Sequence, residues 1–139
     1  MGSMNSEQAD LCIQKLLRIE IRELRHRHEV EIALLHAWYT MRLHGPADDQ
    51  PSIEEQTSLV ATSSLFDQQW YVEHQPRAEL GDLSAAEHYV REGAFMGLDP
   101  GPEFDTMAYY LANPHVAKAG WPALVHHLQH GPAVGEPAV

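Results

Sequence analysis

The sequence predicts an all-α protein in which a long, coiled-coil-like N-terminal helix precedes two helix-turn-helix repeats. Residues 6–44 contain no glycine or proline, and their apolar side chains recur at spacings of three and four, the period of an amphipathic helix. The C-terminal half carries one short pattern twice, which indicates stacked supersecondary units. A chain of 139 residues can hold one modest domain and a helical extension.

The N-terminal helix is expected to begin near Ser6 and to end at Gly45. Residues 1–5, which open with MGSM, are expected to be a disordered tag remnant. A helix of about 38 residues would be about 57 Å long, more than a small domain needs. We therefore expect it to oligomerise with copies of itself. The alternative is a hairpin bent near residues 26–28, although turn residues are missing there.

Apolar residues of this helix are the expected oligomerisation surface. Their average spacing lies slightly above 3.6 residues, so the pattern is not a clean heptad. His28 interrupts the apolar row where a core residue would be expected. A second row runs through Leu16, Ile19, Leu34, Trp38 and Met41. The residues expected to make the contact are Ile13, Leu17, Ile21, Leu24, Ile32, Leu35, Trp38 and Tyr39.

Residues 45–62, GPADDQPSIEEQTSLVAT, are expected to form an acidic linker. Two prolines, four acids and several small polar residues are typical of segments that bury little surface. Ile53, Leu59 and Val60 are its candidates for local docking.

Residues 63–139 contain the repeat, divided into copies over 64–101 and 102–139. A shift of 38 residues aligns the copies without gaps. It pairs Phe66 with Phe104, Asp67 with Asp105, Tyr71 with Tyr109, Pro76 with Pro114, His88 with His126, Gly93 with Gly131 and Gly97 with Gly135.

Each copy is predicted to be a helix pair. Asp67 and Asp105 are expected to cap the first helix, which must stop before the proline that follows. The second helix is expected to begin near Ser84, which opens a capping box, or near Pro122, and to end at Gly93 or Gly131. The segments RAELGD and HVAKAG are expected to be turns. Aromatic side chains are expected to fill the seam: Phe66, Trp70, Tyr71, Tyr89, Phe104, Tyr109, Tyr110 and Trp121.

Charge and cysteine content exclude several classes of function. Residues 1–44 hold equal numbers of acids and bases, so residues 45–139 carry the whole net charge of −11. An acidic surface repels phosphate groups, which argues against nucleic-acid partners and anionic membranes. We expect no membrane insertion, because no apolar run reaches the length of a span. The single cysteine, Cys12, fits a reducing compartment, and without an export signal we expect the cytoplasm.

No residue pattern predicts catalysis or a cofactor, so we expect no enzyme activity within this chain. His126 and His130 are the candidates for a metal site, since they lie four residues apart on a predicted helix. The glutamate of a His-Glu-x-x-His motif is replaced by His127. Because His88 is the equivalent of His126 in the first copy, a structural role explains both histidines, and we expect no metal.

The pattern Phe-Asp-x-x-Trp-Tyr, then Pro, His-Tyr, Gly-x-x-x-Gly and Asp-Pro resembles a bacterial helical repeat of about 38 residues. Its consensus is roughly FDxxWYLxxNPDVAxAGxxPLxHYLxxGxxEGRxP, and the likeness covers about residues 64–137. His127 replaces the expected tyrosine, and the first copy lacks the asparagine before Pro76. The resemblance rests on Phe66, Asp67, Trp70, Tyr71, Pro76, His88, Tyr89, Gly93, Gly97, Asp99 and Pro100, and on Phe104, Asp105, Asn113, Pro114, Val116, Ala119, Gly120, Pro122, Leu124, His126, Leu128, Gly131 and Gly135.

That repeat often lies beside glycosyltransferase domains in polysaccharide and cell-surface glycan assembly proteins. The resemblance therefore implies a non-catalytic oligomerisation or docking module of such a system. Its partners would be copies of itself and another protein or an attached glycosyltransferase domain. One alternative is a stand-alone adaptor that binds a protein partner unrelated to glycans. A second is a small histidine-based metal-binding protein.

Overall fold

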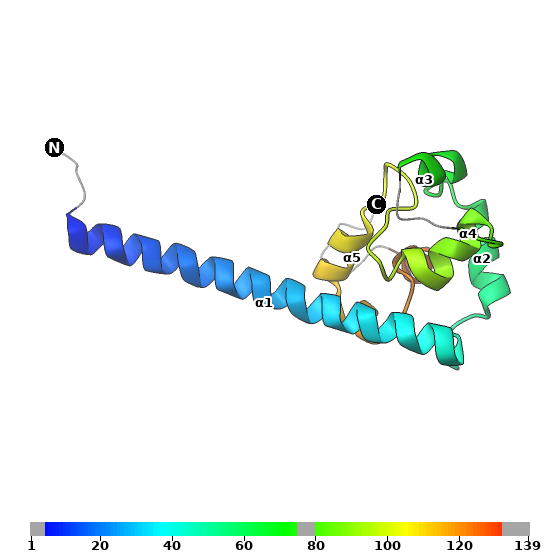
Figure 1. The fold of residues 1–139 in the computed structure, drawn as a ribbon, viewed down its shortest axis with the longest axis horizontal. Helices are drawn as coiled ribbons and strands as arrows, with labels where there is room; N and C mark the ends of the chain where they lie inside the picture. Colours follow the sequence, from blue (N-terminus) through cyan, green and yellow to red (C-terminus); the bar gives the residue numbers. More distant parts are fainter. Residues whose placement is uncertain (1–4, 75–79, 132–139) are drawn as a thin grey trace.

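A computed structural model describes residues 5–74 and 80–131, and it confirms the all-α class (Figure 1). The described residues contain no strand, and their only β-type pairing is an isolated bridge between Gly101 and Phe104. The elements are α1 Ser6–His44, α2 Ile53–Thr62, α3 Gln68–His74, α4 Ala85–His88, the π-helix η1 Tyr89–Gly93, α5 Thr106–Ala112, α6 Pro114–Lys118 and α7 Ala123–His130.

Helix α1 is one continuous helix, so the bent hairpin is wrong. It begins at Ser6, as expected, and Asn5 is its N-cap. The Asn5 side chain accepts a hydrogen bond from the Gln8 amide at 2.8 Å, and the Gln8 side chain accepts one from the Asn5 amide at 3.2 Å. Asn5 is therefore part of the fold and not of a disordered tag. The helix ends at Gly45, whose φ of 73° confirms the predicted stop.

The last part of α1 packs against α5, α6 and η1, while its N-terminal half projects away from them (Figure 1). We call elements α2 to α7 the head. The contact face of α1 consists of Val30, Leu34, Ala37 and Met41, all buried. One turn before that face, His26 Nε2 donates a hydrogen bond to the Leu111 carbonyl at 2.7 Å. The head and the end of α1 thus form one packed body.

Helix α2 corrects the prediction of a linker over 45–62. Ser52 caps the helix by accepting a hydrogen bond from the Glu55 amide at 3.2 Å. Ile53, Gln56 and Val60 are buried against the rest of the head, where α2 contacts α4, η1 and α7. The acids remain exposed, and two of them lie in the first turn, where the helix dipole favours negative charge. Only residues 45–52 connect the two helices.

The two repeat copies make equivalent interactions. Asp67 accepts a hydrogen bond from the Trp70 amide at 3.0 Å, and Asp105 accepts one from the Ala108 amide at 2.9 Å, which confirms both caps. The Tyr71 hydroxyl lies 2.7 Å from His88 Nδ1. In the second copy, the Tyr109 hydroxyl lies 2.6 Å from His126 Nδ1. Residues that are 38 positions apart in the sequence therefore make the same contacts in the two copies.

The copies differ from the prediction after their first helices. In the second copy, α6 begins at Pro114, where a turn was expected, because proline suits the first turn of a helix. In the first copy, Ser84 caps α4 as expected, and Gly93 is the last residue of the π-helix η1 rather than the residue that follows a helix. Gly131 does end α7, with a φ of 73°. The helix α7 begins directly after Pro122, its N-cap residue, as expected.

Gly93 owes its place to packing rather than to backbone conformation. A Cβ atom there would overlap the hydroxyl of Tyr71, which is fully buried. In the first copy, only a residue without a Cβ atom leaves room for the Tyr71 hydroxyl at this position. At Gly131 no atom of the described residues lies within 4 Å of the position of a Cβ, so this close approach is not repeated there.

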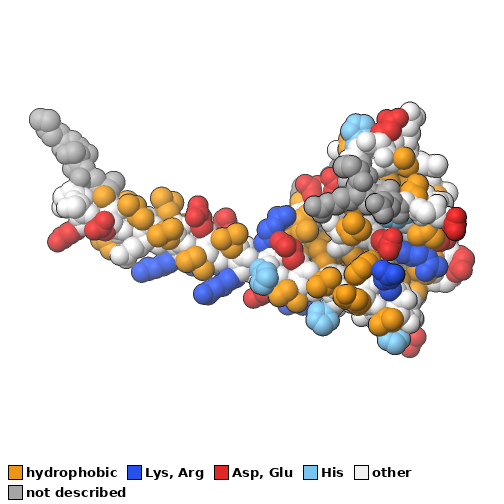
Figure 2. Space-filling model, in the orientation of Figure 1, with side chains coloured by type: hydrophobic (Ala, Val, Ile, Leu, Met, Phe, Trp, Pro, Cys, Tyr) orange, Lys and Arg blue, Asp and Glu red, His pale blue; other side chains and the backbone are white. Residues whose placement is uncertain are grey.

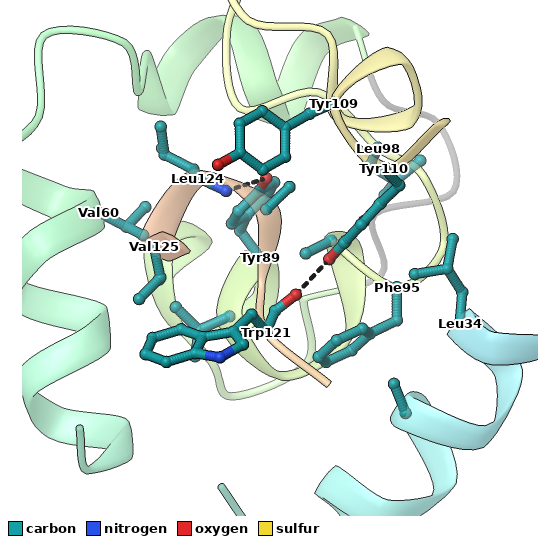
Figure 3. Packing of buried hydrophobic residues seen from close by; sticks show 14 of the residues in the cluster. Leu34, Val60, Tyr89, Phe95, Leu98, Tyr109, Tyr110, Trp121, Leu124 and Val125 are labelled. Atoms are coloured by element: carbon teal, nitrogen blue, oxygen red, sulfur yellow. Dashed lines mark hydrogen bonds between the residues drawn. The ribbon is translucent and has the colours of Figure 1, made fainter. Parts of the chain in front are cut away.

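One core joins both copies to α1 and α2, as the close-up in Figure 3 shows. Tyr110 donates a hydrogen bond to the Trp121 carbonyl at 2.7 Å. Tyr89 accepts one from the Leu124 amide at 3.3 Å and shares another with the Thr106 hydroxyl at 2.9 Å. Among the aromatics expected in the seam, Tyr71, Tyr89, Phe104, Tyr109, Tyr110 and Trp121 are buried, and Phe66 and Trp70 are half-buried.

Candidate interaction surface

The projecting half of α1 exposes large apolar side chains that no part of the described structure covers. Figure 2 shows hydrophobic side chains recurring along this part of the helix. Leu17 is 50% exposed and Leu24 is 65% exposed, whereas Leu34 in the contact face is 2% exposed. Contiguous apolar surface on a projecting element marks an interaction site.

Seven exposed residues form one continuous line, which we call the stripe: Ile13, Leu17, Ile21, Leu24, Ile32, Leu35 and Tyr39. With His28 between Leu24 and Ile32, successive positions are separated by steps of four, four and three residues. This is an eleven-residue repeat, which follows a nearly straight line along an α-helix. At about 100° per residue, the stripe is centred roughly 140° around the helix from the buried contact face. The stripe therefore lies on a side of α1 that does not pack against the head, and it extends from the projecting half past the head.

Trp38 was expected in this surface but lies mainly at the edge of the head. Its ring meets Tyr39 edge-on, with centroids 5.1 Å apart, and the Arg42 guanidinium lies 5.0 Å from its centroid. It also lines a depression between α1 and the head, next to Phe95 and Met107. Trp38 is half-buried, whereas all seven residues of the stripe are exposed.

Charged residues flank the stripe on both sides. Glu20, Arg27 and Glu31 lie along one edge, and Arg27 pairs with Glu31 at 3.1 Å between Nε and Oε1. Arg18, Arg25 and His36 lie along the other edge, and all are exposed. An apolar line edged by charges of both signs is typical of a helix–helix interface. Leu16 and Ile19 are also exposed, but they face another direction from the stripe.

His126 and His130 are adjacent on α7, with ring centroids 4.5 Å apart and nearly parallel planes. Burial is the main cause that lowers the pKa of His126 to about 4, and the neighbouring His130, His115 and His127 contribute to the same shift. His126 Nδ1 is already engaged by the Tyr109 hydroxyl. Across the described ranges, no three His, Cys, Asp or Glu side chains are grouped to hold a metal ion.

In the first copy, the equivalent histidine, His88, and its partner Tyr71 are part of the packed core. Burial raises the pKa of Tyr71 and lowers that of His88, although Glu92 opposes the shift of His88. Both groups are neutral near pH 7, and both lie in the core. A neutral, buried pair of this kind stabilises the fold and presents neither a nucleophile nor a base to a ligand.

Several residues that position this surface have only weak signals in the sequence. Val30 and Ala37 complete the contact face, and His26 anchors the point where α1 leaves the head. The helical spacing of Val30, Leu34, Ala37 and Met41 could have revealed the face, but the stronger apolar row beside it masks that pattern. Buried Gln56 in α2 donates a hydrogen bond to the Pro51 carbonyl. Pro76 lies outside the described residues.

The part of the chain that the structure describes has no helix with the length and apolar character needed to span a bilayer. Comparisons with protein-family models, with curated proteins and with solved structures find no match to this chain.

Proposed function

We propose that this chain is a non-catalytic oligomerisation and docking module, in which α1 joins copies and the head presents a folded surface. The observation that carries the proposal is the stripe, which leaves seven large apolar side chains exposed to water. Burying one such side chain fully is worth about 1.5–3 kcal/mol. Helix packing against a second apolar stripe is the simplest way to cover a line of this length.

The cellular setting that we propose comes from the resemblance of residues 64–137 to the glycosyltransferase-associated repeat. The module would work in the cytoplasm, in a bacterial glycosyltransferase or polysaccharide-assembly system. There α1 would set the copy number, and the head would dock a glycosyltransferase domain or another protein. The matching contacts of Tyr71 with His88 and of Tyr109 with His126 support the repeat itself.

Light scattering of the full chain over a wide concentration range tests the assembly. The expected mass is a multiple of 15.6 kDa that falls towards one chain only on dilution. A mass of one chain at every concentration would overturn the proposal. The setting is tested separately, by measuring binding of the chain to purified glycosyltransferases of its host's polysaccharide system. Binding to none of them would leave an assembly module without a glycan role.

A further inference from the structure

We infer that the stripe is covered by the stripe of a second copy that runs parallel to it and in register. This inference rests on the proposed self-association through α1 and adds the orientation of the pair. It follows from three features of the helix: the place of His28, the charges at the two edges, and the position of the head.

His28 is the one polar position within the line of the stripe. In a parallel pair in register, each position meets its own equivalent, so both His28 rings share one layer. One neutral imidazole can donate the hydrogen bond that the other accepts. An antiparallel pair centred on the stripe would instead set each His28 against Leu24 of the other copy. That arrangement leaves two polar groups facing apolar side chains, which costs free energy.

The edge charges also distinguish the orientations. In a parallel pair, one edge of each helix lies against the opposite edge of the partner helix. A residue on the first edge then faces a partner residue whose number is higher by about five. Glu20 then meets Arg25 of the second copy, which has the opposite charge. In the centred antiparallel pair, Glu20 would meet Glu31, and Arg27 would meet Arg27. Opposite charges favour the parallel pair, and like charges disfavour the antiparallel one.

The head leaves room for this contact. Its contact face on α1 lies roughly 140° around the helix from the stripe, so the head of each copy would sit on an outer side of the pair. Ile32, Leu35 and Tyr39 stay exposed beside the head, so the contact can continue past the projecting half. A parallel pair then carries both heads at the same end.

Disulfide trapping tests the orientation in the full chain. Cys12→Ser removes the native thiol, and Leu17→Cys and Leu35→Cys are then introduced in separate variants. Side chains that meet in one layer approach within the Cβ–Cβ distance that a disulfide needs, about 4 Å. The parallel pair predicts that each variant forms its own disulfide dimer under mild oxidation. The control is Leu16→Cys in the same background, which faces away from the stripe and should stay unlinked.

The outcomes separate the orientation from the assembly. A disulfide that forms only when the Leu17→Cys and Leu35→Cys variants are mixed shows an antiparallel pair and overturns the inference, while self-association stands. A disulfide through Leu17→Cys alone shows contact of the projecting halves only and also overturns it. No disulfide together with a single-chain mass would overturn the proposed function as well.

A charge reversal gives an independent test of orientation. In a parallel pair, Glu20→Arg places like charges together and should weaken the dimer about fivefold, and adding Arg25→Glu should restore it. In the antiparallel pair, Glu20→Arg would remove a repulsion and strengthen the dimer. Dissociation constants measured by sedimentation at low salt distinguish these results, and strengthening would overturn the inference.

Discussion

At the scale of single residues, the structure depends on a close contact between Gly93 and Tyr71. The Tyr71 ring is fully buried, and its hydroxyl is held 2.7 Å from His88 Nδ1. We predict that Gly93→Ala destabilises the fold by about 1–3 kcal/mol, because the new methyl group forces the buried ring to move. Urea unfolding followed by circular dichroism measures the change.

A second substitution separates this contact from the general effect of alanine. Tyr71→Phe removes the hydroxyl, so the double variant Tyr71→Phe with Gly93→Ala should be more stable than Gly93→Ala alone. Tyr71→Phe by itself should cost about 1 kcal/mol through the lost hydrogen bond. Additive losses in the double variant would show that the hydroxyl does not set the requirement for glycine.

His126 gives the head a dependence on pH. Burial is the main reason that its folded-state pKa falls from an ordinary value of 6.5 to about 4. Between these values the unfolded chain binds more protons than the folded chain. The stability from neutral His126 is therefore complete above about pH 6.5 and is lost as the pH falls towards about 4. We predict a lower melting temperature at about pH 5 than at about pH 7.5.

The variant His126→Gln can still bond the Tyr109 hydroxyl but does not titrate. Its melting temperature should fall less between the same two pH values. His88 is also neutral in the core, and burial lowers its pKa, so part of the decline should remain. An unchanged decline in His126→Gln would mean that acid acts elsewhere in the molecule.

At the scale of elements, α1 has two apolar faces with different roles. Leu34 belongs to the core, and its neighbour Leu35 belongs to the stripe. We predict that Leu34→Ala lowers the free energy of unfolding by about 2–5 kcal/mol, whereas Leu35→Ala changes it by less than about 1 kcal/mol.

Both substitutions are best measured in a chain that also carries Leu17→Ser and Ile21→Ser, so that association does not add to stability. Equal losses from Leu34→Ala and Leu35→Ala would contradict the assignment of the two faces. In the unmodified background, Leu35→Ala should instead weaken association.

The extent of α1, its exposed row and the repeat could be predicted because each leaves a local pattern. Glycine and proline mark the end of α1, and Asp67 and Asp105 mark the starts of equivalent helices. Helix α2 was missed because acids and prolines dominate residues 45–62, although Ser52 and Glu55 mark its first turn. The role of Gly93 was missed because it depends on Tyr71, which is distant in sequence.

At the scale of the whole molecule, the sequence could not say whether the head packs on α1. That contact needs Val30, Leu34, Ala37 and Met41 to meet α5, α6 and η1, and such pairing is decided by tertiary packing. In the structure, the head packs on one side of α1, and the stripe on another side of the same helix stays exposed. Assembly through the stripe would therefore hold two or more heads in a fixed relation. Binding of a multivalent partner would then gain from avidity.

The central claim is that the stripe, and not exposed apolar surface in general, joins copies of this chain. The most direct measurement compares the masses in solution of two double variants of the full chain. Leu17→Ser with Ile21→Ser alters the stripe. Leu16→Ser with Ile19→Ser alters equally exposed residues on another side of the same helix, with the same effect on helix propensity.

The account predicts a mass of 15.6 kDa for the stripe variant and the mass of the unaltered assembly for the control variant. Circular dichroism should show both variants folded. Loss of the assembly in both variants would show that any exposed apolar surface suffices. An unchanged assembly in the stripe variant would show that the copies meet elsewhere and would contradict the account.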